Sequence, residues 1–307
     1  MPRYSLDDLD LSPGKRARLY RLFHEHGPGG GIAMFLPVDQ GLEHGPRDFF
    51  DNPDALNPEF ELRLAEAGNF SAVVFQIGIA EKNMGRYAGR VPLVLKLNGK
   101  TEIPSDDDAF SPCNATVEDA VRLGADAVGY TLYVGSPAQD RDFIQFREVR
   151  REAEHLGMPI IVWSYPRGKA VEAKGGQLTP YAIEYAARVA QELGADVVKV
   201  NLPELNAEKE KQTPAPYKNA SFEEEEAVRR VVEAAGRTPV LVSGGAQKDE
   251  ADVIHKAQLS MRAGATGIIF GRNVWQRPYD VALSLTKRLQ DVMRESAGVR
   301  EPALSHR

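Results

Sequence analysis

Cysteine is nearly absent from this sequence of 307 residues, because Cys113 is the only one. A single cysteine cannot close an internal disulfide, which is typical of proteins kept in a reducing compartment. Residues 1–30 also lack the basic, apolar and small-residue pattern of a signal peptide. Both absences favour a cytoplasmic protein.

Long apolar runs and excess positive charge are missing as well. No stretch approaches ~18 uninterrupted apolar residues, the length of a membrane-spanning helix, so we expect no membrane partner. The net charge of -6 argues against a nucleic-acid partner, although it does not exclude a local anion site. With 42% hydrophobic and 27% charged residues the composition is that of a globular protein, and α/β barrels of this size form one domain.

Two ligand-binding motifs are absent too. No Gly-x-Gly-x-x-Gly follows the first apolar run, so nothing indicates a dinucleotide-binding fold. No histidine, cysteine and carboxylate set has zinc-like spacing, so we expect no metal site. Asp106, Asp107 and Asp108 could bind a divalent cation, but no histidine lies near them in sequence, and a solvated loop is the favoured interpretation.

What the sequence does contain is a repeat. Eight times a glycine precedes a short apolar run, which indicates a helix ending at the glycine, a turn and a buried strand. The runs are 32–36, 72–75, 92–95, 127–130, 159–163, 196–201, 240–242 and 267–270. Segments with the length and polarity of surface helices lie between them, at 139–157, 179–193, 221–235, 248–263 and 278–296.

Eight strands alternating with helices predict a (β/α)8 TIM barrel, with a doubly wound open sheet as the alternative. We expect a single domain over 1–307, with the barrel at 31–297 and a helical extension at 1–30. Ser12-Pro13 opens the extension's helix, which should run to about His26 and cover one end of the barrel.

The sixth run carries a lysine at its centre. Side chains alternate along a strand, so Val197, Lys199 and Asn201 share one face. A buried ammonium is costly unless it is paired or has a lowered pKa. Lys199 is therefore either paired with a carboxylate or water, or a nucleophile able to form a Schiff base.

Other polar residues follow the strands, at the barrel end where active sites are built. Asp39 either hydrogen-bonds a substrate hydroxyl or positions the lysine, or is a helix cap or loop aspartate. Tyr165 is an acid/base if a cation stabilises its phenolate, or a structural tyrosine. Lys96 is a rival nucleophile or a second cation that lowers the pKa of Lys199. His44 has a structural, phosphate-facing or catalytic role. Further candidates are Trp163 and Arg167.

The last two strands end in glycine-rich turns. Ser243, Gly244 and Gly245 follow the seventh strand, and Gly271 and Arg272 follow the eighth. Backbone N–H groups in such turns can approach an anion closely, and an arginine can add a charged donor. Together they predict a phosphate site.

Four segments carry a resemblance to a known family. Residues 37–46, 162–168, 197–201 and 271–276 resemble the archaeal-type (DhnA-like) class I fructose-bisphosphate aldolases, in the same order along roughly residues 30–290. Two features differ from the shortest members of that family. Gln40 stands where those often have histidine, and the connections 98–115 and 202–220 are long.

The resemblance implies reversible cleavage of fructose 1,6-bisphosphate to dihydroxyacetone phosphate and glyceraldehyde 3-phosphate. It implies a Schiff base on Lys199 with no cofactor and no metal, proton transfer by Tyr165, and Asp39 and Trp163 in the pocket. Ser243 and Arg272, with the glycines beside them, would hold a phosphate of the sugar-phosphate substrate. A lysine-dependent thiolase, a ketosugar-phosphate synthase and a non-catalytic sugar-phosphate-binding barrel are the alternatives, and we expect a homo-oligomer.

Overall fold

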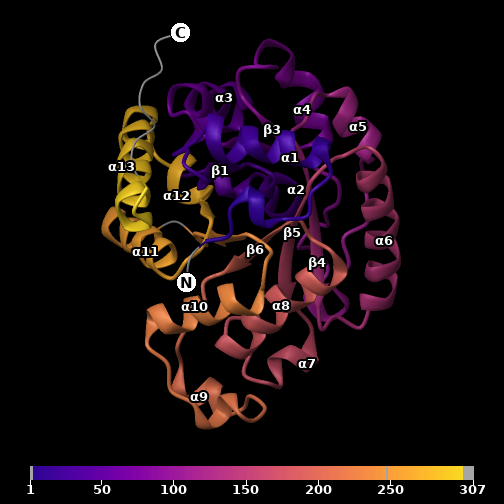
Figure 1. Cartoon of the computed structure of the whole chain (residues 1–307), viewed down its shortest axis with the longest axis vertical. Helices are drawn as coiled ribbons and strands as arrows, with labels where there is room; N and C mark the ends of the chain where they lie inside the picture. Colours follow the sequence, from indigo (N-terminus) through magenta and orange to yellow (C-terminus); the bar gives the residue numbers. More distant parts are fainter. Residues whose placement is uncertain (1–2, 247, 300–307) are drawn as a thin grey trace.

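The computed structural model describes residues 3–246 and 248–299, and its eight strands close into a parallel barrel (Figure 1). Each strand pairs with the next along the chain, and β1 pairs with β8, with Ala33 opposite Gly267. The strands are β1 Ala33–Pro37, β2 Ala72–Gln76, β3 Leu93–Lys96, β4 Ala127–Val134, β5 Ile160–Pro166, β6 Val197–Asn201, β7 Val240–Ser243 and β8 Gly267–Ile269. The predicted (β/α)8 barrel is confirmed, and the open-sheet alternative is wrong.

Strand alternation separates two cores. Phe35, Ile161 and Val197 belong to the cluster inside the barrel. Val198 and Val200 belong to the larger cluster between the strands and the surrounding helices. Because side chains alternate along a strand, Lys199 lies on the inward face with Val197, as the sequence predicted.

The N-terminal segment closes the amino end of the barrel. Helix α1 (Pro13–Tyr20) begins at Ser12, whose hydroxyl accepts a hydrogen bond from the backbone N–H of Lys15. It continues as a π-helical turn over Arg21–Glu25. Leu19, Leu22 and Phe23 are buried and pack with the inward-facing strand residues. The predicted cap at one end of the barrel is confirmed.

The helices surround the barrel, and every segment predicted to be a surface helix contains one. They are α2 Gln40–His44, α3 Pro58–Ala67, α4 Ile77–Asn83, α5 Val117–Arg122, α6 Gln139–His155, α7 Lys169–Glu172, α8 Pro180–Leu193, α9 Ala207–Glu210, α10 Glu224–Ala234, α11 Glu250–Arg262, α12 Arg272–Trp275 and α13 Tyr279–Ala297. Short 3-10 turns occupy Leu6–Asp8, Gly45–Phe49, Pro53–Leu56, Met84–Arg86, Asp106–Asp108 and Tyr217–Asn219.

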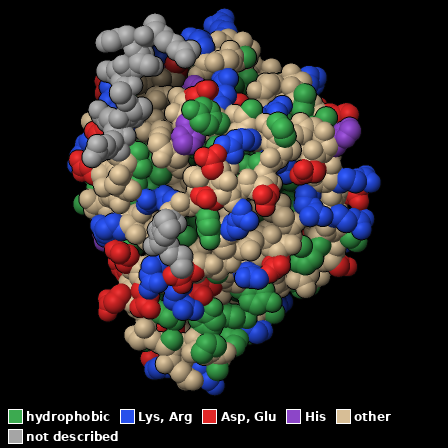
Figure 2. Space-filling model, viewed as in Figure 1, with side chains coloured by type: hydrophobic (Ala, Val, Ile, Leu, Met, Phe, Trp, Pro, Cys, Tyr) green, Lys and Arg blue, Asp and Glu red, His purple; other side chains and the backbone are tan. Residues whose placement is uncertain are grey.

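The two long connections leave the carboxyl ends of β3 and β6. The second carries α9 and projects at the lower edge of Figure 1. On the side of the molecule seen in Figure 2, acidic and basic side chains are interspersed and do not form a large patch of one charge. Within residues 3–246 and 248–299, none of the helices has both the length and the apolar character needed to span a bilayer.

Candidate active site

Two buried lysines face the carboxyl end of the barrel, and their surroundings differ. Lys96 Nζ donates to Thr131 Oγ1 at 2.7 Å and to the Asn98 carbonyl at 3.1 Å, and it lies 3.6 Å from Asp39 Oδ2. Lys199 is 5% exposed, and among the described residues no carboxylate lies within ion-pairing distance of its amine. Lys96 is therefore a held cation, whereas Lys199 is not paired.

Aromatic rings provide the immediate surroundings of Lys199. Its Nζ lies 5.0 Å from the centre of the Trp163 ring and 5.6 Å from that of Tyr165. Lys96 Nζ lies 5.2 Å from the same Trp163 ring. A side chain at Gly129 would meet both Trp163 and Lys96 at less than 3.0 Å, so this close packing requires a glycine. The indole thus contacts both lysines.

Burial lowers the pKa of Lys199 to about 8. The carboxylates of Asp39 and Glu43 oppose this shift, and the guanidinium of Arg272 adds to it. The sequence had suggested Lys96 as the cation that lowers this pKa. Instead the charge of Lys199 contributes to the lowered pKa of Lys96, and the positive charge of Lys96 is balanced by nearby Asp39.

Tyr165 keeps its proton in this site. Burial raises the pKa of its phenol, and the negative charges of Glu43 and Asp39 raise it further. Arg167 and Arg272 act in the opposite direction but do not prevail. The sequence had suggested a phenolate stabilised by a nearby cation, but the raised pKa keeps Tyr165 in its protonated phenol form. Tyr165 is a hydrogen-bond donor there.

Asp39 and Trp163 each carry a buried polar atom without a partner. Among the described residues neither Asp39 Oδ1 nor Trp163 Nε1 makes a hydrogen bond. Buried polar atoms are normally paired, so an unpaired acceptor and an unpaired donor on two residues that both contact Lys96 favour a ligand that bonds to both. Asp39 also precedes α2 without capping it, so the cap interpretation is wrong.

Arg167 and the 98–115 connection meet above the site. Arg167 Nε donates to Asp106 Oδ2 at 3.0 Å, and Lys100 Nζ pairs with Asp106 Oδ1 at 2.8 Å. The Arg167 guanidinium also lies 5.2 Å from the centre of the Tyr165 ring. Asp107 pairs with Lys169 at 3.0 Å. Asp106 and Asp107 are thus ion-paired with basic side chains in a loop, which agrees with the predicted loop rather than with a site for a divalent cation.

The glycine-rich turns after β7 and β8 are held together. Ser243 Oγ donates to Asn201 Oδ1 at 2.6 Å, which joins the ends of β7 and β6. Asn273 Nδ2 donates to the Gly244 carbonyl at 3.1 Å, and Asn273 Oδ1 accepts from the Lys248 backbone N–H at 2.9 Å. A side chain at Gly244 would clash with Asn273 at 2.6 Å. Close packing against Asn273 therefore requires a glycine at position 244.

Arg272 belongs to a chain of charges with two residues of the first βα connection. Its Nη1 lies 3.6 Å from Asp48 Oδ2, and His44 Nδ1 lies 2.6 Å from the same oxygen. His44 and Arg272 hold the pKa of the Asp48 carboxyl below its usual value. The structure therefore gives His44 a positioning contact toward the β8 turn.

The described residues hold no cluster of three or more histidine, cysteine, aspartate or glutamate side chains arranged to bind a metal ion. The site combines three cations, the two carboxylates Asp39 and Glu43, and two aromatic rings at the carboxyl end of the barrel. Lys199, Lys96 and Arg272 supply positive charge, and Asp39 and Glu43 supply negative charge.

Comparison with known proteins identifies the family. Residues 33–277 match the DeoC/LacD family aldolase. A Thermoproteus tenax fructose-bisphosphate aldolase class 1 is 43% identical over 273 residues, which are 89% of this chain and 93% of that protein. The chain belongs to the DeoC/LacD family of aldolases.

Solved structures of aldolases are also similar to this chain in both sequence and fold. An archaeal fructose-1,6-bisphosphate aldolase, with its catalytic lysine covalently bound to the carbinolamine intermediate of the substrate, has 40% identity and a TM-score of 0.75. The match covers 90% of this chain and 98% of that one. A fructose-bisphosphate aldolase from Slackia heliotrinireducens has 27% identity and a TM-score of 0.80, over 99% of both chains.

Several contacts in this site were not predicted. Glu43 lies within the 37–46 segment but was not predicted as a site residue. Its negative charge opposes the lowering of the pKa of Lys199 and of Lys96, and adds to the raised pKa of Tyr165. Thr131 holds Lys96 because β4 runs to Val134, beyond the apolar run that predicted this strand. Glu43 could have been found as one helical turn after Asp39.

Proposed function

We propose that this protein is a class I fructose-bisphosphate aldolase that cleaves fructose 1,6-bisphosphate through a Schiff base on Lys199. The observation that carries the proposal is the contrast between the two lysines. Lys199 has a pKa of about 8 and no paired carboxylate among the described residues, whereas Lys96 is held by three oxygens. An amine attacks a carbonyl only when it is neutral and unpaired.

The first steps follow from these protonation states. Neutral Lys199 attacks the C2 carbonyl of the substrate and forms a carbinolamine. Tyr165, whose raised pKa keeps it protonated, donates its proton to the departing hydroxyl. Water leaves, and a protonated imine on Lys199 then lies beside the Tyr165 phenolate. The new positive charge compensates the phenolate that burial otherwise disfavours.

Carbon–carbon cleavage uses the same tyrosine in the opposite direction. The Tyr165 phenolate removes the C4 hydroxyl proton, and the C3–C4 bonding electrons move into the imine. Glyceraldehyde 3-phosphate leaves, and a neutral enamine remains on Lys199. Tyr165 then protonates C3, and hydrolysis of the new imine releases dihydroxyacetone phosphate and the neutral amine. Each proton that Tyr165 gives is later returned, so the cycle closes.

The unpaired atoms beside Lys199 have roles in this scheme. Asp39 Oδ1 would accept a hydrogen bond from a substrate hydroxyl, and Trp163 Nε1 would donate one. Lys96 would hold Asp39 in place through their 3.6 Å contact. Such preorganised contacts fix the substrate in a reactive pose, which can lower a barrier by several kcal/mol.

The phosphate-binding assignment rests on the turns after β7 and β8. Backbone N–H groups of Gly244, Gly245 and Gly271, with the Ser243 hydroxyl and the Arg272 guanidinium, would hold one phosphate. Arg167 and Lys100 are further cations that follow β5 and β3, and Asp106 pairs with both. They would bind the second phosphate. His44 would act through Asp48 on Arg272.

A coupled assay with fructose 1,6-bisphosphate tests the proposal. We expect dihydroxyacetone phosphate at a rate that falls below detection in Lys199→Met. Absence of cleavage in the wild-type protein, with borohydride trapping of dihydroxyacetone phosphate intact, would instead favour a thiolase or synthase. Absence of both would favour a non-catalytic barrel.

Assembly and location belong to the same proposal. We expect a homo-oligomer, and Phe50 (79% exposed) and Ile103 (90% exposed) are large apolar side chains that a subunit contact would cover. Sedimentation analysis of the full chain would contradict this if it gave a monomer at micromolar concentration. A cytoplasmic location remains a prediction from the single cysteine.

A further inference from the structure

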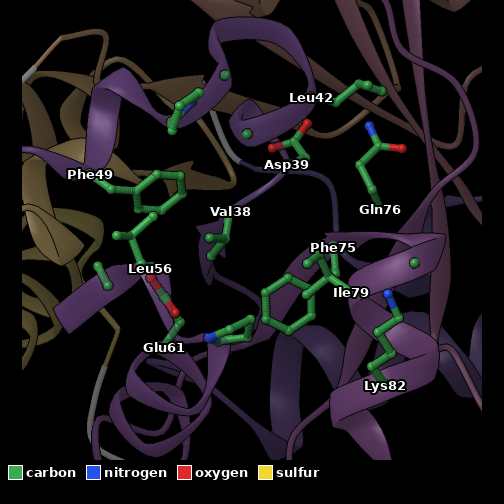
Figure 3. A pocket seen from close by; sticks show the side chains of 16 residues that line it. Val38, Asp39, Leu42, Phe49, Leu56, Glu61, Phe75, Gln76, Ile79 and Lys82 are labelled. Atoms are coloured by element: carbon green, nitrogen blue, oxygen red, sulfur yellow. The ribbon is translucent and has the colours of Figure 1, made fainter. Parts of the chain in front are cut away.

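A cavity of about 460 Å³ lies beside the carboxyl ends of β1 and β2, between α3 and α4. Its walls are mostly apolar and include Phe49, Leu56, Phe75 and Ile79 (Figure 3). This volume falls within the range of small-molecule sites, which are typically apolar with a few polar groups. Lys199 does not line it, so the cavity is separate from the reacting amine.

One carboxyl group is buried in the wall of this cavity. Glu61, in the first turn of α3, is 0% exposed. Figure 3 shows its side chain beside Leu56 among the residues that line the cavity. Neither carboxyl oxygen bonds to another residue within the described part of the chain, and no described basic side chain forms an ion pair with it. A buried carboxyl without a partner is unusual and needs an explanation.

The protonation state of Glu61 selects the kind of partner. Burial raises the pKa of Glu61 to about 8, so the group is a neutral acid at pH 7. A neutral carboxylic acid has one O–H donor and one carbonyl acceptor. A ligand that satisfies both must offer an acceptor and a donor side by side.

The cavity wall also limits the charge of the ligand, because it carries Lys82 and Asp39 as well as Glu61. A cationic ligand would have to ionise Glu61 in an apolar wall, and Lys82 lines the same cavity and opposes a second positive charge. An anionic ligand would lose its hydration among apolar side chains, and Asp39 also lines the cavity. Both costs favour an uncharged molecule.

We propose that this cavity binds a small uncharged molecule with an apolar ring and a primary carboxamide, which pairs with the Glu61 carboxyl through two hydrogen bonds. The ring occupies the space between Phe75, Ile79 and Leu56. Val38 and Asp39 belong to the same wall, so the bound molecule contacts the strand end that faces Lys96. The cavity shares Asp39 with the proposed aldolase site, but Lys199 and Tyr165 do not line it.

Titration calorimetry of the full chain with benzamide at pH 6.5 tests this proposal. We expect one site per chain, at least about tenfold weaker binding of methyl benzoate, which lacks the donor, and a similar loss in Glu61→Leu. Glu61→Gln should retain binding, because its amide offers both a donor and an acceptor. Equal affinity for the two probes, or no binding of benzamide, would overturn the proposal.

A second pair of variants avoids any dependence on how Glu61→Leu folds. Ile79→Trp should fill the cavity and abolish benzamide binding, whereas Ile144→Trp, at an exposed position of α6, should leave it unchanged. Raising the pH from 6.5 to 9 should weaken binding to the wild-type protein and not to Glu61→Gln. Binding that survives Ile79→Trp places benzamide elsewhere and contradicts the assignment.

Discussion

The lowered pKa of Lys199 sets the pH dependence of the proposed reaction. With a pKa of about 8, about one lysine in ten is neutral at pH 7. An ordinary lysine, with a pKa of 10.5, would be neutral in about one molecule in 3,000 at that pH. Burial in this site therefore increases the reactive fraction by roughly 300-fold.

The acid limb of kcat/KM measures this pKa in the free enzyme. We expect kcat/KM to rise about tenfold per pH unit up to pH ~8 and then level off. Two variants should move the midpoint in opposite directions. Arg272→Gln removes a charge that lowers the pKa of Lys199, so the midpoint should rise. Asp39→Asn removes a charge that raises it, so the midpoint should fall.

The comparison uses the midpoint and not the rate, because both variants also weaken substrate binding. A midpoint above pH 10 in the wild-type protein would refute the buried, unpaired amine. A midpoint that moves upward in Asp39→Asn would refute the electrostatic part of the argument, even if the wild-type value were as expected.

Three further predictions concern proton transfer, Glu61 and metals. Tyr165→Phe should lower kcat by ~10²–10⁴ while borohydride still traps the adduct, since the amine acts before the phenol; an unchanged kcat would remove Tyr165 from the cycle. Glu61 has a folded-state pKa raised from 4.5 to about 8, so its contribution to stability is full below pH ~4.5 and is lost as pH rises through ~8. Urea denaturation should therefore show the wild type losing up to about 4–5 kcal/mol relative to Glu61→Gln over that window, and parallel curves would contradict the raised pKa. Excess EDTA should leave cleavage unchanged; loss of activity that a divalent ion restores would contradict imine catalysis.

The sequence was informative where the physics is local. A glycine followed by an apolar run predicted each strand, and alternation along one strand placed Lys199 inside the barrel. Ser12 was correctly predicted to open its helix, because a cap involves only neighbouring residues. The segment predicted as a helix at 221–235 begins later in the structure, because α10 starts at Glu224.

Contacts between distant segments could not be predicted in this way. The pairing of Arg272 with Asp48 joins the last βα connection to the first, and no spacing rule relates the two positions. The protonated state of Tyr165 depends on burial and on Glu43, which reaches the site only through the short helix α2. The sequence could name the candidate residues, but their charges depend on the assembled barrel.

The central claim is that Lys199 alone forms the imine, and covalent trapping tests it most directly. The wild-type protein is treated with dihydroxyacetone phosphate and borohydride, and peptide mapping locates the reduced adduct. Lys199→Met and Lys96→Met serve as a matched pair, because each removes one buried lysine. We predict one adduct per chain at Lys199 in the wild type and in Lys96→Met, and none in Lys199→Met. An adduct on Lys96, or turnover in Lys199→Met, would contradict the account.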